Sequence, residues 1–214
     1  NTWPYLEVQQ SRYRFRFLNG CQSRFLILDF ASIPGVEVWQ IGNEGGFLAA
    51  PVDITALGNR VLMGLAERAD VIVDFGNVPE GHYTLGNIGP DEPFGGGVPG
   101  EDFPIADPDS TGQVMQFRVG PVVAPDLTTP PQFLQLPPIA PLPAPVRTRA
   151  LALLEQMSAY WDGPAEALLG SVTEDGMAMP MMWMDPVTEN PAVGDTEIWE
   201  FYNATVDAHP MHIH

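Results

Sequence analysis

Apolar and polar residues alternate along several short segments of the first 120 residues, which predicts β-strands. In 12–17 the aromatic residues Tyr13, Phe15 and Phe17 alternate with arginine, the period-two pattern of a strand with one buried face. Six further segments have strand character: 24–30, 36–42, 60–65, 70–75, 82–88 and 113–119. Because turn residues rather than amphipathic helical patterns separate them, the sequence predicts a β-sandwich or barrel.

Two segments lack this alternation of apolar and polar residues. Residues 89–112 hold six acidic residues, five prolines and six glycines without periodicity, and we favour a solvated surface loop over a substrate-facing one. Residues 120–146 contain nine prolines, which indicates an extended linker rather than a proline-rich ligand for a recognition domain. We therefore expect one domain at 1–120, a linker at 121–146 and a second domain at 147–214.

The pattern after the linker is less regular. Residues 147–156 fit either a strand or a helix. Pro164 at the start of 164–169 indicates a short helix, because proline is favoured in the first helical turn. Residues 195–203 have the pattern of a strand.

Composition narrows the possible partners. The chain has 27 acidic residues against nine basic ones, all of them arginine, for a formal charge of −18. This balance excludes a nucleic-acid-binding protein and disfavours an anionic membrane surface. No apolar run reaches the roughly 18 residues of a membrane-spanning helix. A single cysteine excludes a disulfide within the chain.

Three of the four histidines, His209, His212 and His214, occupy the last six residues as His-Pro-Met-His-Ile-His. Imidazole is a common ligand of copper and zinc, so we favour metal binding over a surface patch or a purification tag. In an extended strand, His212 and His214 point to the same face, roughly 6.5–7 Å apart, which suits two neighbouring ions. The odd offset from His209 to His212 places His209 on the opposite face, where it would serve a separate site.

This motif resembles the His-Pro-x-His-Leu-His segment of the multicopper oxidases, the superfamily of laccases and ferroxidases. The longer run DPVTENPAVGDTEIWEFYNATVDAHPMHIH is similar to the branch of bacterial spore-coat laccases and bilirubin oxidases. Upstream, PYLEVQQSRYRFRFLNGCQSRF and LAERADVIVDFGNVPEG resemble the copper-free second domain of that branch. The resemblance extends over residues 4–214 and is weakest across 89–112 and 120–175. It implies an all-β fold of cupredoxin-like Greek-key β-sandwiches: a near-complete second domain and the N-terminal part of the third, copper-binding domain.

The resemblance also implies a copper ligand set. His209 would ligate the type 1 copper, and His212 and His214 would bind the type 2 and type 3 coppers of the trinuclear cluster. Such an enzyme oxidises a small-molecule reductant by one electron at a time and reduces O₂ to water. It would lie in the periplasm, the cell exterior or the spore coat.

The family's other copper motifs are not in these 214 residues: the two His-x-His motifs of a first domain and the terminal His-Cys-His run. We therefore expect an internal fragment that is inactive alone. The remainder of the oxidase or another chain would complete its sites. The alternative is a copper-free, cupredoxin-like structural or interaction module.

Four further features have simpler interpretations. Cys21 is interpreted as a buried structural thiol. Five methionines between Met177 and Met184 favour core packing over copper handling. His82 is interpreted as a surface strand residue. The sequon at Asn203 is discounted as a glycosylation site because it leads into the candidate copper segment.

Overall fold

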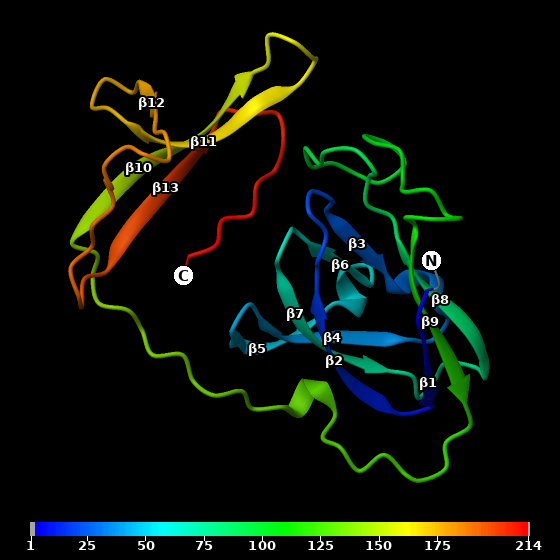
Figure 1. Ribbon diagram of the computed structural model, residues 1–214. Helices are drawn as coiled ribbons and strands as arrows, with labels where there is room; N and C mark the ends of the chain where they lie inside the picture. The colour runs from blue at the N-terminus through cyan, green and yellow to red at the C-terminus, as the bar shows by residue number, and fades with distance from the viewer. Residues whose placement is uncertain (1–2, 214) are drawn as a thin grey trace. The chain divides into compact units, whose positions relative to one another are not determined.

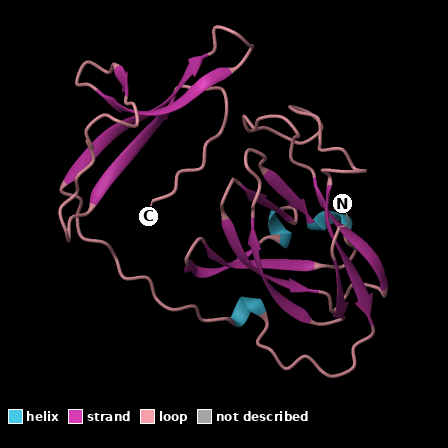
Figure 2. Ribbon diagram, viewed as in Figure 1, coloured by secondary structure: helices cyan, strands magenta, loops and turns pink. Residues whose placement is uncertain are grey.

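The computed structural model describes residues 3–213, and apart from three short 3₁₀ helices its regular elements are all strands, as the sequence predicted (Figures 1 and 2). The chain forms two compact units. One comprises Asn1–Ile139 together with His209–His214, and the other comprises Ala140–Ala208. Within the described part of the chain, no helix is long and apolar enough to cross a membrane.

The first unit is a sandwich of two sheets. One has the order β1-β9-β8-β3-β6, with β1 (Tyr5–Gln9), β9 (Gln113–Gly120), β8 (Gly81–Asn87), β3 (Leu26–Asp29) and β6 (Arg60–Met63). The other has the order β2-β7-β4-β5, with β2 (Arg12–Leu18), β7 (Arg68–Asp74), β4 (Glu37–Asn43) and β5 (Gly46–Asp53). The chain passes from one sheet to the other between β1 and β2 and again between β2 and β3, a Greek-key-like connectivity.

Alternating side chains from both sheets form the core of this sandwich. On β7, Ala69, Val71 and Val73 are buried, whereas the residues between them are partly exposed. From the opposite sheet, Leu85 of β8 and Phe117 of β9 are fully buried in the same cluster. The aromatic residues of β2 pack against this cluster and its arginines face outward, which confirms the predicted alternation.

The acidic segment 89–112 is irregular, as predicted, but it is not simply a solvated excursion. Phe94 and Phe103 are 8% and 9% exposed. The ring of Phe94 lies 5.1 Å from that of Phe25 and 5.6 Å from that of Phe103. These two aromatic residues therefore anchor the loop to the sandwich.

The second unit is one four-stranded sheet of order β12-β11-β10-β13. Its strands are β10 (Arg147–Met157), β11 (Pro164–Val172), β12 (Ala178–Pro180) and β13 (Glu197–Asn203). The prediction of a helix at 164–169 is wrong, because this segment pairs antiparallel with β10. Pro164 begins a strand instead, a position where its missing N–H costs little. The ambiguous segment 147–156 is a strand, as is 195–203 over most of its length.

The proline-rich segment is extended and contains only a short 3₁₀ helix, η3 (Pro131–Phe133). Its start is tied to β2. The Arg12 backbone N–H donates to the Asp126 carboxylate at 2.9 Å, and the Arg12 guanidinium donates to Thr128 Oγ1 at 2.9 Å.

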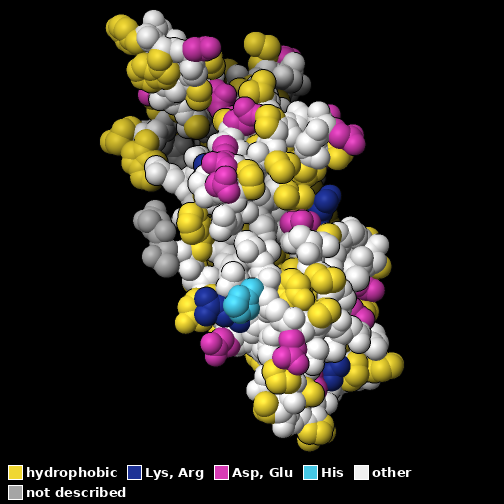
Figure 3. All heavy atoms as spheres, turned by 90° about the vertical axis from the view of Figure 1, so that its right-hand side faces the viewer, with side chains coloured by type: hydrophobic (Ala, Val, Ile, Leu, Met, Phe, Trp, Pro, Cys, Tyr) yellow, Lys and Arg dark blue, Asp and Glu magenta, His cyan; other side chains and the backbone are white. Residues whose placement is uncertain are grey.

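Acidic side chains are scattered among apolar and other residues on the face in Figure 3, without gathering into one patch.

Candidate metal centre

The histidine segment begins after a turn at the end of β13. The Asn203 side chain organises this turn: its Oδ1 accepts from the Thr205 backbone N–H at 3.0 Å, and its Nδ2 donates to the Asp207 carbonyl at 2.7 Å. Residues 208–213 do not form a strand, although a strand was assumed for the histidines from the sequence. Residues 209–213 belong to the first unit.

His212 is held by two groups of the sandwich. Its Nε2 lies 2.8 Å from the carbonyl oxygen of Leu65, and its Nδ1 lies 3.7 Å from Oε2 of Glu44. A carbonyl oxygen only accepts, so Nε2 carries the hydrogen in this contact. With Nε2 protonated, the contact between Nδ1 and the Glu44 carboxylate is attractive only in the doubly protonated ring, whereas the neutral ring leaves on Nδ1 the lone pair that a metal would need.

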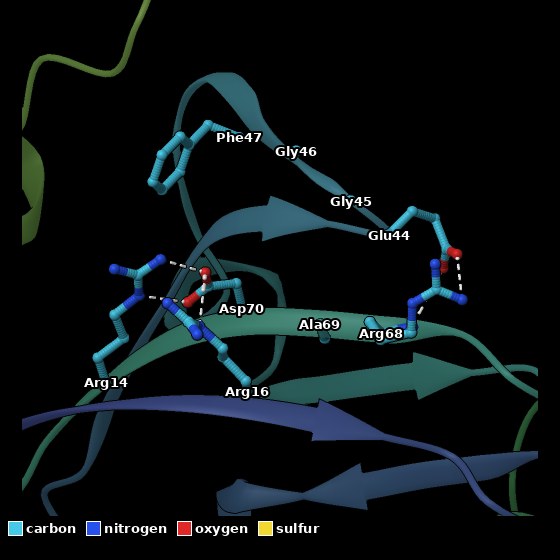
Figure 4. Close-up of a pocket in the computed structure, with 9 residues that line it drawn as sticks. All are labelled: Arg14, Arg16, Glu44, Gly45, Gly46, Phe47, Arg68, Ala69 and Asp70. Atoms are coloured by element: carbon cyan, nitrogen blue, oxygen red, sulfur yellow. Dashed lines mark hydrogen bonds and ion pairs between the residues drawn. The ribbon is translucent and has the colours of Figure 1, made fainter.

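Glu44 is itself fixed by Arg68. The Arg68 guanidinium lies 2.9 Å from Glu44 Oε2, and the Arg68 backbone N–H donates to Glu44 Oε1 at 3.1 Å. Figure 4 shows this pair at one end of a pocket on the β2-β7-β4-β5 sheet. The His212 ring therefore contacts a carboxylate whose position is already set by the sheet.

The turn at Gly64 and Leu65 is shaped to receive the segment. A Cβ on Gly64 would lie 3.0 Å from Phe25 Cε1 and 3.2 Å from Pro210 Cβ. Glycine thus permits the close approach of Pro210.

Asn19 organises the same turn. It is 1% exposed, and its Nδ2 donates to the carbonyls of Arg24 and Met63 at 2.9 and 3.1 Å. Its backbone carbonyl accepts from the Ala66 N–H at 3.0 Å. The sequence analysis did not identify Asn19 as a structural residue. Its position next to a strand was the available signal.

The other two predicted ligands are His209 and His214. His209 is half-buried, and His214 lies outside the described residues. Among residues 3–213, no group of three or more His, Cys, Asp or Glu side chains is placed to hold a metal ion. The described part of the chain thus brings His212 to a defined environment without assembling a complete metal centre.

Two expectations for sulfur-containing residues are wrong. Cys21 is half-buried rather than buried, and its backbone N–H donates to Asn19 Oδ1 at 2.9 Å. The methionines at 177, 179, 182 and 184 are 64%, 50%, 49% and 88% exposed, so they do not pack in a core of the described chain. His82 is exposed on β8, as predicted.

No protein-family model matches the sequence. It is 32% identical over 214 residues to "Multicopper oxidase LPR1" of Arabidopsis thaliana, a match that covers 99% of this chain and 32% of that protein. It is 33% identical over 213 residues to a laccase of Bacillus subtilis (strain 168), covering 99% of this chain and 36% of that protein.

Solved structures lead to the same family. A variant of the McoA multicopper oxidase of Aquifex aeolicus matches with a TM-score of 0.62 and 25% identity, covering 99% of this chain and 42% of that one. The chain spans about a third of the length of the curated relatives it matches. Across that third, the chain is similar to multicopper oxidases and laccases.

Proposed function

We propose that this chain is part of a laccase-like multicopper oxidase, which couples one-electron oxidation of a small-molecule reductant to the four-electron reduction of O₂ to water. The observation that carries the proposal is the His-Pro-Met-His-Ile-His segment, in a chain that aligns over 99% of its length with multicopper oxidases and laccases.

The donor set fits copper. His209 would ligate the type 1 copper, and His212 and His214 would bind the type 2 and type 3 coppers. When bound, the coppers would supply one-electron transfer from the reductant and the reduction of O₂. The Leu65 carbonyl would keep a proton on Nε2 of the neutral His212 ring, which would leave Nδ1 as the nitrogen that ligates copper.

The 214 residues supply only part of the ligand set. A type 1 site needs a soft thiolate, and the single thiol, Cys21, is bound through its backbone to Asn19, far from the histidines in sequence. The remaining ligands would come from the rest of the oxidase or from another chain. The chain alone would therefore be inactive.

The proposed organisation follows from the resemblance of the sequence to multicopper oxidases. Residues 1–120 would be the second, copper-free cupredoxin-like domain, 121–146 the linker, and 147–214 the N-terminal part of the third domain. The enzyme would act outside the cytoplasm, in the periplasm, the cell exterior or the spore coat. The charge of −18 argues against nucleic acid and anionic membranes as partners.

The test is copper analysis of a complete oxidase that contains this chain. We expect the His209→Ala variant to lose the blue absorption band while retaining the trinuclear coppers. The His212→Ala and His214→Ala variants should keep the band but consume no O₂ with a phenolic donor. His82→Ala, an exposed histidine outside the motif, is the matched control and should behave as wild type.

Two outcomes contradict the proposal. A complete protein that binds no copper and consumes no O₂ would favour the copper-free structural module. Retention of the blue band in His209→Ala would show that the assignment of histidines to sites is wrong.

A further inference from the structure

A pocket of about 380 Å³ lies on the outer face of the β2-β7-β4-β5 sheet. Arginines line it from β2 and β7, and the Gly45-Gly46 turn and Phe47 close it on the β5 side (Figure 4). Its arginines are Arg14, Arg16 and Arg68, and its acids are Glu44 and Asp70. Three arginines against two acids leave one excess positive charge, in a chain whose net charge is −18.

Arg14 and Asp70 form the fixed part of the pocket. Arg14 donates from Nε to Asp70 Oδ1 at 2.8 Å and from Nη2 to Asp70 Oδ2 at 2.5 Å. Its guanidinium also lies 5.4 Å from the centre of the Phe47 ring. A two-bond pair and a ring contact together leave Arg14 little freedom to turn toward a ligand.

Gly42 of β4 allows Asp70 to sit where it does. A Cβ on Gly42 would lie 3.0 Å from Asp70 Cβ and 2.9 Å from the carbonyl oxygen of Gly46. The absence of a side chain therefore permits the close approach of β4 to Asp70 and to the Gly46 carbonyl, two residues that line the pocket.

Arg16 is the arginine placed to meet an anion. Its Nε is 3.9 Å from Asp70 Oδ2, and 76% of its side chain is exposed. The Asp70 oxygen it faces already accepts the shorter bond from Arg14. Arg68, by contrast, is paired with Glu44 at 2.9 Å. The guanidinium N–H groups of Arg16 would therefore donate hydrogen bonds to a ligand carboxylate.

The exposed ring of Phe47 favours a ligand that also has an apolar part. The residue is 42% exposed and lines the pocket opposite Arg16. A planar ring has more favourable contact with exposed aromatic surface than a fully hydrated inorganic ion has. We propose that this pocket binds a small aromatic carboxylate, with the carboxylate on Arg16 and the ring against Phe47.

Glu44 at one end of the pocket contacts His212, but the proposed binding uses Arg16 and Phe47 and needs no copper, so its test is independent of the proposed oxidase function. Benzoate is the probe, titrated into the 214-residue chain and followed by NMR. We expect saturable shifts at Arg16, Gly46 and Phe47, with a dissociation constant on the order of 1 mM for a site this open to solvent. Acetate and sulfate should bind more weakly, because neither has a ring to place against Phe47.

Two variants localise the binding. Arg16→Gln should weaken benzoate binding about fivefold, and Phe47→Leu should weaken benzoate binding without changing that of sulfate. Arg60→Gln is the matched control, because Arg60 pairs with Asp29 on the other sheet with a side chain 49% exposed. Equal losses in Arg16→Gln and Arg60→Gln, shifts confined to other residues, or acetate binding as tightly as benzoate would each overturn the proposal.

Discussion

The carboxylate of Asp126 accepts a hydrogen bond from the backbone N–H of Arg12 at 2.9 Å, across 114 positions of sequence. The Arg12 guanidinium lies 3.2 Å from the same carboxylate oxygen. This pair ties the first residues of the proline-rich segment to β2, at the edge of its sheet. The proline-rich segment thus leaves the sandwich from a fixed point.

Asp126 should stabilise the first unit at neutral pH, and this stabilisation should be lost in acid. Burial favours its protonated form, but hydrogen bonds from Thr128 and the Arg12 backbone outweigh that effect and hold the pKa of Asp126 below its usual value. A lowered folded-state pKa gives stability that is present above the unfolded value of about 4 and is lost as pH falls below it. We expect Asp126→Asn to lower the free energy of unfolding by about 1 kcal/mol at pH 7 and less below pH 4. Urea denaturation at both pH values checks this.

Asp109 provides the control for that measurement, because it is an exposed aspartate of the 89–112 loop. Asp109→Asn should leave the pH dependence of unfolding close to that of wild type. If both variants lose the same stability at pH 7, the Asp126 tie contributes nothing specific.

The parallel pairing of β10 and β13 should also depend on pH. The Arg149 guanidinium, followed by the Trp199 indole N–H, holds the pKa of Glu197 at about 2, below its ordinary carboxyl value. These bonds measure 2.6 Å and 2.8 Å to Glu197 Oε2. Their stabilising effect is present above pH 4.5 and is lost as pH falls toward 2.

We expect Glu197→Gln to raise amide hydrogen exchange along β13 at pH 6, with a smaller difference from wild type near pH 2.5, after correction for intrinsic rates. Glu200→Gln on the same strand is the matched control, because Glu200 is exposed. Protection in Glu197→Gln equal to that of wild type at pH 6 would contradict the role of this ion pair.

Gly64 should be needed for docking of the histidine segment. In Gly64→Ala the new methyl group would crowd Phe25 and Pro210 at 3.0 and 3.2 Å. We expect a loss of about 1 kcal/mol and release of His212 from the Leu65 carbonyl. The readout is the His212 Nε2–H resonance in NMR, which should exchange slowly in wild type and fast in the variant.

Gly20→Ala controls for the general effect of adding a methyl group, since a Cβ there would have no atom within 4 Å. Slow exchange of the His212 proton in Gly64→Ala would show that Gly64 does not determine docking.

Asn19 should be one of the most sensitive polar positions in the sandwich. Asn19→Ala would leave the carbonyls of Arg24 and Met63 and the N–H of Cys21 without their side-chain partner. We expect a loss of about 2–4 kcal/mol by urea denaturation. The exposed Asn190 is the comparison. A similar loss of stability in Asn190→Ala would show that the buried hydrogen bonds of Asn19 do not account for its effect.

The sequence by itself determined seven of the nine strands that the structure describes in the first unit and missed β1 and β5, because local alternation specifies a strand with one buried face only where it is regular. The aromatic and arginine positions of β2 predicted its inner and outer faces correctly. The same period-two logic located most of the other strands. The histidine motif and the resemblance to multicopper oxidases followed from residue identity alone.

Features that depend on contacts between distant segments of the chain were decided only by the tertiary structure. Pro164 suggested a helix start, yet pairing with β10 makes 164–172 a strand, because ladder hydrogen bonds outweigh weak local propensity. Likewise, contacts with Leu65 and Glu44, 147 and 168 positions away, define the ring of His212. No short-range pattern encodes such contacts, because they depend on which distant turns the folded sandwich brings together.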